Sequence, residues 1–180
     1  GNQAKMKGNF ERPNIRAMKG YVPGEQPSDQ SVIKLNTNEN PYPPSPTVFQ
    51  SLAEFDAATL RRYPSPSALA FREAAARHHG INVEEIIATR GGDELLRLVL
   101  TTFVDPGEKV AVASPAYSLY PVLTAIQDGQ LEEIELNDEW MPDERFAEKA
   151  NERGCKVAFI VNPHAPSGTL VSQSLVKAIA

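Results

Sequence analysis

From residue 85 to residue 161, short apolar runs alternate with longer segments that would be amphipathic as helices. The apolar runs lie at residues 85–89, 109–113, 131–136 and 156–161, and the amphipathic segments lie at residues 91–103, 119–126 and 143–153. Such an alternation is typical of a mostly parallel sheet with helices on both faces, and the crossovers of such a sheet are right-handed. We therefore predict an α/β fold.

The first part of the chain has a different character, because six of the 15 prolines fall within residues 41–66. The elements expected up to residue 44 are an arm or linker with a short helix at residues 1–33, a brief strand at residues 33–35 and a rigid polar loop at residues 36–44. We therefore expect an N-terminal arm over residues 1–45, followed by the first part of a large domain over residues 46–180.

Two helices are expected after the polar loop. Ser45 followed by Pro46 indicates a helix start, because serine caps a first turn and proline fits the first helical position. This helix would carry on one face Val48, Leu52, Phe55 and Leu60. Ser67 is expected to cap the second helix, and Gly80 to end it, as glycine often does after a last turn.

Charge and composition narrow the classes of partner. Lys and Arg number 18 and Asp and Glu number 23, so the net charge is −5, and this mild acidity argues against a nucleic-acid binder. Cys155 is the single cysteine, and its place at the start of an apolar run favours a buried small hydrophobe. The apolar runs are too short to span a bilayer, and no secretory signal is recognised. We therefore expect no membrane partner and a cytoplasmic location.

Unusual residues follow three of the expected strands, at the sheet edge where open parallel sheets bind ligands. Gly91 and Gly92 begin a helix, whose free N–H groups and positive dipole end can hold a phosphate. Tyr117 follows the next strand, and an aromatic ring there can lie over a planar ligand. Asn162 and His164 lie in a loop shaped by two prolines and a glycine. Each feature alone also fits a purely structural turn, and His164 alone does not indicate a metal site.

Taken together, five motifs resemble the fold-type-I pyridoxal-phosphate (PLP) aminotransferases, and within them most closely the histidinol-phosphate aminotransferases. The motifs are the segment at residues 34–42, Arg62-Tyr63-Pro64, residues 91–95, Pro115-Ala116-Tyr117 with Tyr120, and the loop at residues 162–168. They follow one another in the family's order and spacing, and the resemblance runs from about residue 14 to the end of the chain.

The resemblance implies a role for each motif toward the cofactor. The backbone N–H groups of Gly92 and Asp93 would hold the PLP phosphate, and Tyr117 would stack on the pyridine ring. Tyr63 would donate its hydroxyl to the phosphate of the neighbouring subunit's cofactor, which requires a homodimer.

The resemblance also implies substrate contacts and a departure from the family. Asn40 and Tyr42 would line the substrate pocket, partly across the dimer interface. Ala165 stands where most relatives carry an asparagine that bonds the ring oxygen of PLP. We expect Asn162 to supply a donor to that oxygen in its place, with His164 as the second choice.

The implied reaction moves an amino group between L-histidinol phosphate and 2-oxoglutarate, with glutamate as the other amino compound. PLP catalysis needs a lysine for the Schiff base, and the family places it after the asparagine loop. The lysines present are Lys5, Lys7, Lys19, Lys34, Lys109, Lys149, Lys156 and Lys177, and none has the expected serine–lysine context. We therefore expect this sequence to be the front part of a longer protein, without catalytic residues of its own and inactive as 180 residues.

Other functions also fit these motifs. Threonine-phosphate decarboxylases and aromatic aminotransferases share them, and the residues that would distinguish these enzymes are absent from the 180 residues. A non-catalytic fragment that binds phosphate is an alternative of another class. A Rossmann-type nucleotide-binding module is a weaker one, because the chain has no glycine triplet of the dinucleotide-binding type.

Overall fold

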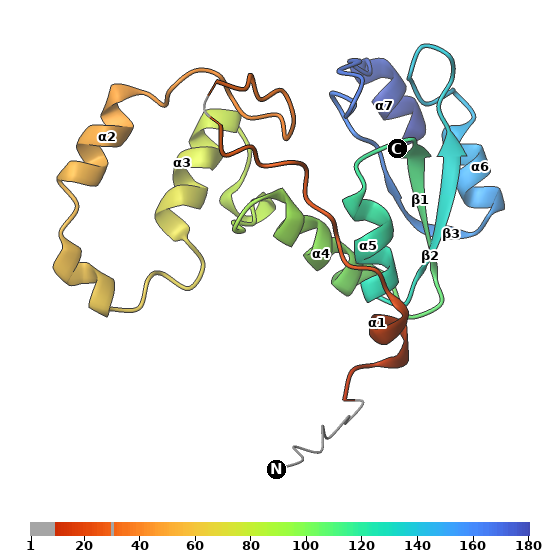
Figure 1. Cartoon of the computed structure of the whole chain (residues 1–180), viewed down its shortest axis with the longest axis horizontal. Helices are drawn as coiled ribbons and strands as arrows, with labels where there is room; N and C mark the ends of the chain where they lie inside the picture. The colour runs from red at the N-terminus through yellow and green to blue at the C-terminus, as the bar shows by residue number, and fades with distance from the viewer. Residues whose placement is uncertain (1–9, 30) are drawn as a thin grey trace. The chain divides into compact units, whose positions relative to one another are not determined.

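The computed structural model describes residues 10–29 and 31–180 (Figure 1). Contacts between residues divide the chain into two compact units. We call residues 10–21 with residues 90–180 the sheet unit, and the described residues between 22 and 89 the helical unit. Each is described by itself. The domain boundary expected after residue 45 stays a prediction. It divides an arm that would line the substrate pocket from the large domain, whereas the two units are defined by contacts between residues.

The sheet unit is built on three parallel strands, in the order β2-β1-β3. The strands are β1 (Lys109–Ser114), β2 (Gln130–Glu135) and β3 (Cys155–Phe159). The central strand β1 is buried from Val110 to Ala113, as expected for a strand with neighbours on both sides and helices on both faces. This confirms the predicted α/β fold and three of its four strands, which begin or end one or two residues away from the predicted positions.

Helices cover both faces of this sheet, and Figure 1 shows α5 and α6 on opposite sides of it. The helices of the unit are α1 (Pro13–Ala17), α4 (Gly92–Phe103), α5 (Leu119–Ile126), α6 (Phe146–Glu152) and α7 (Gln173–Ile179). On one face Val110 packs with Leu100 of α4 and Leu123 of α5. On the other face Ala111 packs with Phe146 of α6. Successive residues of β1 thus feed two separate cores, as the alternation of side chains along a strand requires.

The short helix expected in the arm is α1, and it is tied to the end of α5. Arg12 Nη2 donates to Ile126 O at 2.6 Å, and Asn14 Nδ2 donates to Ala125 O at 2.9 Å. The last carbonyls of a helix have no partner within the helix, so these two side chains satisfy the end of α5. This contact places the segment that leads to Tyr21 within the sheet unit.

The helical unit contains α2 (Pro46–Ala53), η1 (Ala57–Arg61), α3 (Leu69–His79) and η2 (Val83–Glu85). The predicted cap of α2 is confirmed, because Ser45 Oγ accepts a hydrogen bond from the N–H of Thr47. Gly80 ends α3 with a φ of 67°, also as predicted. The helix expected to carry Leu60 is divided instead: Asp56 caps a separate 3₁₀ turn with its side chain.

Two predictions about the helical unit are wrong in detail. Ser67 does not cap α3: the N-cap position is Ala68, and Ser65 Oγ accepts from the N–H of Leu69 at 3.3 Å. Residues 33–35 form no strand. Lys34 instead pairs with the carboxylate of Glu39 within the same segment, and no neighbouring strand is described beside it.

The strand predicted at residues 85–89 is also absent from the structure. Arg72 of α3 donates from Nε to Ile86 O at 2.7 Å and from Nη2 to Val83 O at 2.6 Å. A guanidinium group thus takes carbonyls that a strand would offer to a neighbouring strand. Glu85 therefore ends η2, and residues 86–89 lead into α4 as an irregular segment.

None of the helices within residues 10–29 and 31–180 is long and apolar enough to cross a membrane.

Candidate functional site

Tyr117 lies in the loop that joins β1 to α5, at the carboxyl end of the central strand. Its hydroxyl lies 3.5 Å from the hydroxyl of Tyr21, and the two rings meet edge to face with centroids 6.2 Å apart. The hydrogen bond to Tyr21, burial and the Asp93 carboxylate raise the pKa of Tyr117 to about 12. The contact with Tyr21 therefore holds the Tyr117 side chain in place, and its phenol group stays neutral at ordinary pH.

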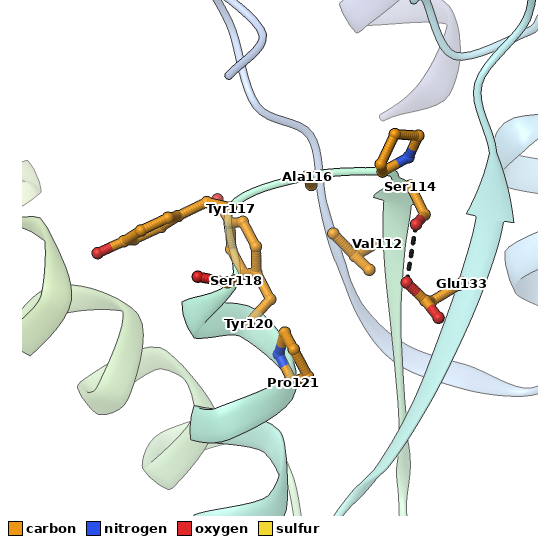
Figure 2. Close-up of a pocket in the computed structure, with 9 residues that line it drawn as sticks. Val112, Ser114, Ala116, Tyr117, Ser118, Tyr120, Pro121 and Glu133 are labelled. Carbon is orange, nitrogen blue, oxygen red and sulfur yellow. Dashed lines mark hydrogen bonds between the residues drawn. The ribbon is translucent and has the colours of Figure 1, made fainter. Parts of the chain in front are cut away.

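An open pocket of about 210 Å³ lies on one side of this loop. Figure 2 shows the Tyr117 ring extending from the loop away from β1, while Ser114 Oγ donates to Glu133 Oε1 at 2.7 Å. Pockets that enclose a whole small-molecule ligand usually measure about 300–1,000 Å³. This pocket is smaller, so by itself it would hold only part of a ligand.

The start of α4 is the candidate phosphate site. Gly91 is its N-cap, with φ 101° and ψ 177°, and a Cβ added to Gly92 would meet no atom within 4 Å. The first N–H groups of a helix lack partners within the helix and lie at its positive end. Glu94 Oε2 accepts from the N–H of Arg90 at 2.6 Å, which holds this carboxylate against the preceding backbone. The space beside Gly92 is thus open to an anion.

The start of α4 and Tyr117 belong to the same part of the sheet unit. The charge of Asp93 is among the causes that raise the pKa of Tyr117, and Tyr117 packs on the core cluster that contains Leu100 of α4. The structure therefore brings together the predicted phosphate and stacking residues.

The loop that follows β3 is closed at its base by Asn162. Asn162 Oδ1 accepts from the N–H of Val171 at 2.9 Å, and Asn162 Nδ2 donates to Val171 O at 3.1 Å. An amide nitrogen carries two hydrogens, so these bonds leave one N–H of Asn162 for another acceptor. Asn162 is consequently a structural clamp that still has one donor to offer.

His164 is buried within this loop, with 3% of its surface exposed. Its Nε2 lies 2.7 Å from Pro115 O and its Nδ1 lies 2.7 Å from Ser167 Oγ. Both ring nitrogens are thus engaged, which favours Asn162 over His164 as the donor to a cofactor oxygen. The bond to Pro115 also joins this loop to the loop of Tyr117.

The remaining predicted residues, Asn40, Tyr42 and Tyr63, lie in the helical unit. Asn40 Oδ1 accepts from the N–H of Tyr42 at 2.9 Å, which shapes the loop between them. The side chains of Tyr42 and Tyr63 are exposed. Neither tyrosine is fixed by packing within its unit, and their roles toward substrate and cofactor stay predictions.

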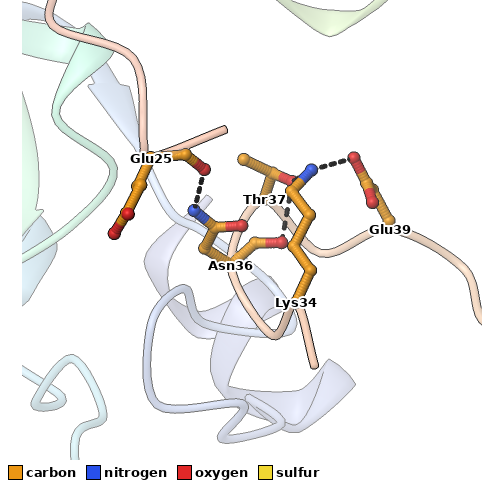
Figure 3. Close-up of polar contacts among 5 residues, drawn as sticks. All are labelled: Glu25, Lys34, Asn36, Thr37 and Glu39. Carbon is orange, nitrogen blue, oxygen red and sulfur yellow. Dashed lines mark hydrogen bonds and ion pairs between the residues drawn. The ribbon is translucent and has the colours of Figure 1, made fainter. Parts of the chain in front are cut away.

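Polar contacts order the segment that leads to Asn40 (Figure 3). Asn36 Nδ2 donates to Glu25 O at 2.8 Å, and Lys34 pairs with Glu39. Lys109 and Lys149 are likewise paired, with Glu132 and Asp143. Among the described residues, three lysines are thus engaged with carboxylates.

Two aromatic residues near the site were not among the predicted ones. Tyr21 bonds Tyr117 from 96 positions away, and the ring of Trp140 lies with its centroid 5.9 Å from that of His164. Contacts between positions so far apart in the chain leave no local pattern. The one feature of the sequence that could have drawn attention to Trp140 is that it is the single tryptophan of the chain.

Three comparisons place the chain among known proteins. Residues 30–180 match the family model described as aminotransferase class I and II. A histidinol-phosphate aminotransferase of Rhodopirellula baltica is 43% identical over 163 residues, which are 90% of this chain and 44% of that protein. One from Geotalea uraniireducens is 41% identical over 170 residues, which are 94% of this chain and 48% of that protein.

A solved structure agrees with the fold. Histidinol-phosphate aminotransferase from Sinorhizobium meliloti in complex with pyridoxal-5'-phosphate matches with a TM-score of 0.81 and 21% identity, over 97% of this chain and 49% of that chain. At that identity the likeness shows the fold alone. The chain thus spans just under half the length of the curated relatives described above and of this solved chain.

The resemblance deduced from the five motifs is therefore confirmed at the level of the family. The family model covers the helical unit from residue 30 and the whole of the sheet unit from residue 90 onward. With relatives about 40% identical over nine tenths of its length, the chain belongs to the aminotransferase class I and II family.

Proposed function

We propose that the protein containing this chain carries out PLP-dependent transamination of L-histidinol phosphate with 2-oxoglutarate, in the cytoplasm. One observation carries the proposal: the start of α4, Tyr117 and the loop at residues 162–171 come together in the sheet unit. Membership of the aminotransferase family and the names of the relatives support it.

The residues present fit PLP in three respects. The open space beside Gly92 at the positive end of α4 suits a phosphate. The neutral ring of Tyr117 suits a stack on a planar heterocycle. The remaining N–H of Asn162 suits an oxygen acceptor on that ring.

In this proposal the protein binds and orients, while the cofactor supplies the electron sink for chemistry at the carbon that bears the amino group. The N–H groups of Gly92 and Asp93 hold the phosphate and so fix the position of the ring. Tyr117 covers one face of the ring and excludes water from it. Asn162 donates to the ring oxygen, the task that Ala165 cannot perform because it has no side-chain donor.

A homodimer is part of the proposal, because Tyr63 would serve the cofactor of the neighbouring subunit. The helical unit has large apolar side chains that are exposed and so available for such a contact, among them Phe49, Leu52, Phe55, Leu60, Leu69 and Phe71. Asn40 and Tyr42 of the same unit would then line the substrate pocket.

The test is a comparison of substrates on the purified full-length protein that contains this sequence, with PLP added. We expect glutamate to form from 2-oxoglutarate when L-histidinol phosphate is the amino donor, and far less with phenylalanine. Preference for phenylalanine would instead identify an aromatic aminotransferase. Release of CO₂ from threonine phosphate would identify a decarboxylase, and PLP binding without any turnover would identify a non-catalytic phosphate binder.

A further inference from the structure

His164 is one of two polar residues, with Thr124, that are buried among the residues described in the structure. Its two hydrogen bonds run in different directions. Ser167, the partner of Nδ1, belongs to the same loop, whereas Pro115, the partner of Nε2, lies 49 positions earlier in the loop of Tyr117. The imidazole is therefore a direct bridge between the loops that follow β1 and β3.

The chemistry of the partner fixes the direction of this bridge. A backbone carbonyl only accepts hydrogen bonds, so Nε2 of His164 carries a proton and donates it to Pro115 O at 2.7 Å. Because proline has no backbone N–H, Pro115 contributes to this contact only through its carbonyl oxygen. Tyr117 lies two residues further on, so the bridge holds the backbone next to the stacking ring.

Trp140 packs beside the imidazole of this bridge. Its ring lies at an interplanar angle of 35° to the His164 ring, and its backbone has a φ of 62°, a conformation that is an outlier for a bulky residue. Asn137 holds the turn in this shape, since its Oδ1 accepts from the N–H groups of Glu139 and Met141, both at 3.0 Å. His164 is 3% exposed, and a hydrogen bond shielded from water is stronger than an exposed one.

We propose that His164 is a positioning residue that sets the place of the Tyr117 ring by bridging the two loops, with Trp140 packed beside the imidazole. This rests on the proposed function for the part that concerns PLP, since Tyr117 is there the residue that stacks on the cofactor. His164 thereby sets the distance between the Tyr117 ring and the loop that carries Asn162. It gives His164 no contact with the cofactor.

Two variants that differ by one methylene separate this role from simple packing. In His164→Gln the amide nitrogen takes roughly the place of Nε2 and can still donate to Pro115 O. In His164→Asn the amide group takes roughly the place of Nδ1, so it reaches Ser167 and not Pro115. The proposal therefore predicts that glutamine rescues what asparagine loses.

The first readout is hydrogen–deuterium exchange in the protein without cofactor. We expect the amides of residues 116–120 to exchange faster in His164→Asn than in wild type, and at close to the wild-type rate in His164→Gln. Residues 146–152 of α6, on the other face of the sheet, serve as the internal control. Equal exchange at residues 116–120 in both variants would overturn the bridge, whether or not the protein binds PLP.

The second readout is PLP affinity, followed by the absorbance of the bound cofactor. We expect His164→Asn to bind PLP about threefold to tenfold more weakly, the effect of one lost hydrogen bond, and His164→Gln to stay within about twofold of wild type. Equal weakening in both variants would reduce His164 to a packing role. A wild-type protein that does not bind PLP would instead overturn the proposed function and leave the exchange result to decide the bridge.

If His164→Asn does not fold, the wild-type protein still tests the proposal. Long-range ¹H–¹⁵N NMR of the histidine side chains reports which ring nitrogen carries a proton. The bridge requires a proton on Nε2 of His164. A ring protonated only on Nδ1 would contradict it.

Discussion

Tyr117 shows at the scale of one residue how the site is prepared before any ligand arrives. Three neighbours act on its hydroxyl in the same direction: the hydrogen bond to Tyr21 is the largest cause, and burial and the charge of Asp93 add to it. Their shared effect is to favour the neutral phenol over the charged phenolate. A neutral ring is the form suited to lie against another aromatic ring.

The first prediction is that Tyr21→Phe lowers the pKa of Tyr117 from about 12 toward its ordinary value of 10. The lost hydrogen bond is the largest cause of the shift, so its removal should have the largest effect. The measurement is the absorbance of tyrosinate at alkaline pH, with Tyr117→Phe as the control that identifies the transition. A Tyr117 transition unchanged by Tyr21→Phe would show that burial, and not Tyr21, sets this pKa.

The raised pKa of Tyr117 also determines how the stability of the protein changes with pH. Because the pKa is raised in the folded state, the contribution of Tyr117 is fully present below pH 10 and declines as the pH rises from 10 toward 12. The wild-type protein should therefore lose free energy of unfolding over this interval more steeply than Tyr117→Phe does. Parallel stability curves for the two proteins would remove Tyr117 as the cause.

At the scale of one element, α4 depends on two adjacent glycines that differ in conformation. Gly91 has φ 101° and ψ 177°, a region that is almost restricted to glycine. Gly92 has no positive φ, and a Cβ there would meet no neighbour. Substitution of Gly91 therefore tests backbone strain, whereas substitution of Gly92 tests contact with a ligand.

We predict that Gly91→Ala lowers the free energy of unfolding by about 1–3 kcal/mol through backbone strain, whereas Gly92→Ala leaves it nearly unchanged. If the phosphate of PLP lies beside Gly92, the added methyl group of Gly92→Ala should weaken PLP binding. Thermal unfolding without cofactor gives the first effect, and PLP titration gives the second. A Gly92→Ala protein with wild-type affinity would mean that the phosphate lies elsewhere.

A second element, α6, is held at its start by an ion pair. Lys149 Nζ lies 2.5 Å from Asp143 Oδ2, and Lys149 is the largest cause that lowers the pKa of Asp143. A lowered carboxyl pKa contributes stability above its ordinary value of 3.8, and that contribution is lost as the pH falls through the folded-state pKa. Because both side chains are partly exposed, we expect less than about 1 kcal/mol from this pair.

The matching prediction is that Asp143→Asn destabilises the protein slightly at pH 7 and that the difference from wild type shrinks as the pH falls below 3.8. Salt should reduce the difference as well, because exposed charges are screened. Urea unfolding at several pH values measures both effects. A difference that does not shrink as the pH falls below 3.8 would point instead to the backbone contact between Asp143 and the N–H of Arg145.

The strands also show which elements could be predicted from the sequence and why others could not. The strand at residue 109 was recognisable because its neighbours bury it from Val110 to Ala113, and burial dictates its composition. The strands at residues 130 and 155 are only partly buried, and they were recognisable as apolar runs within the same alternation. The apolar runs at residues 33 and 85 looked similar, but a strand needs a neighbour, and Arg72 took the carbonyls of Ile86 and Val83 instead.

The same limit applies to the candidate site. Tyr117 and Asn162 stood out because they follow recognisable strands. The partners that hold them, Tyr21 for Tyr117 and Val171 for Asn162, and the bridge of His164 to Pro115 join positions that no local pattern connects. The motifs therefore identified the residues, and only the fold showed how they are fixed.

At the scale of the whole molecule, the proposed role of Tyr63 requires a second copy of the protein. Tyr63 is fully exposed in the helical unit, and the proposal gives it the phosphate of the neighbouring subunit's cofactor. We predict that the full-length protein sediments as a dimer and that Tyr63→Phe weakens PLP binding by about 0.5–1.5 kcal/mol, the contribution of one hydrogen bond. An active monomer, or a Tyr63→Phe dimer with unchanged affinity, would refute this role.

The most direct test of the central claim is a crystal structure of the full-length protein with PLP bound. We expect the phosphate at the N–H groups of Gly92 and Asp93, the pyridine ring against Tyr117, and the ring oxygen within hydrogen-bond distance of Asn162 Nδ2. A phosphate bound away from the start of α4, or a ring that does not touch Tyr117, would contradict it.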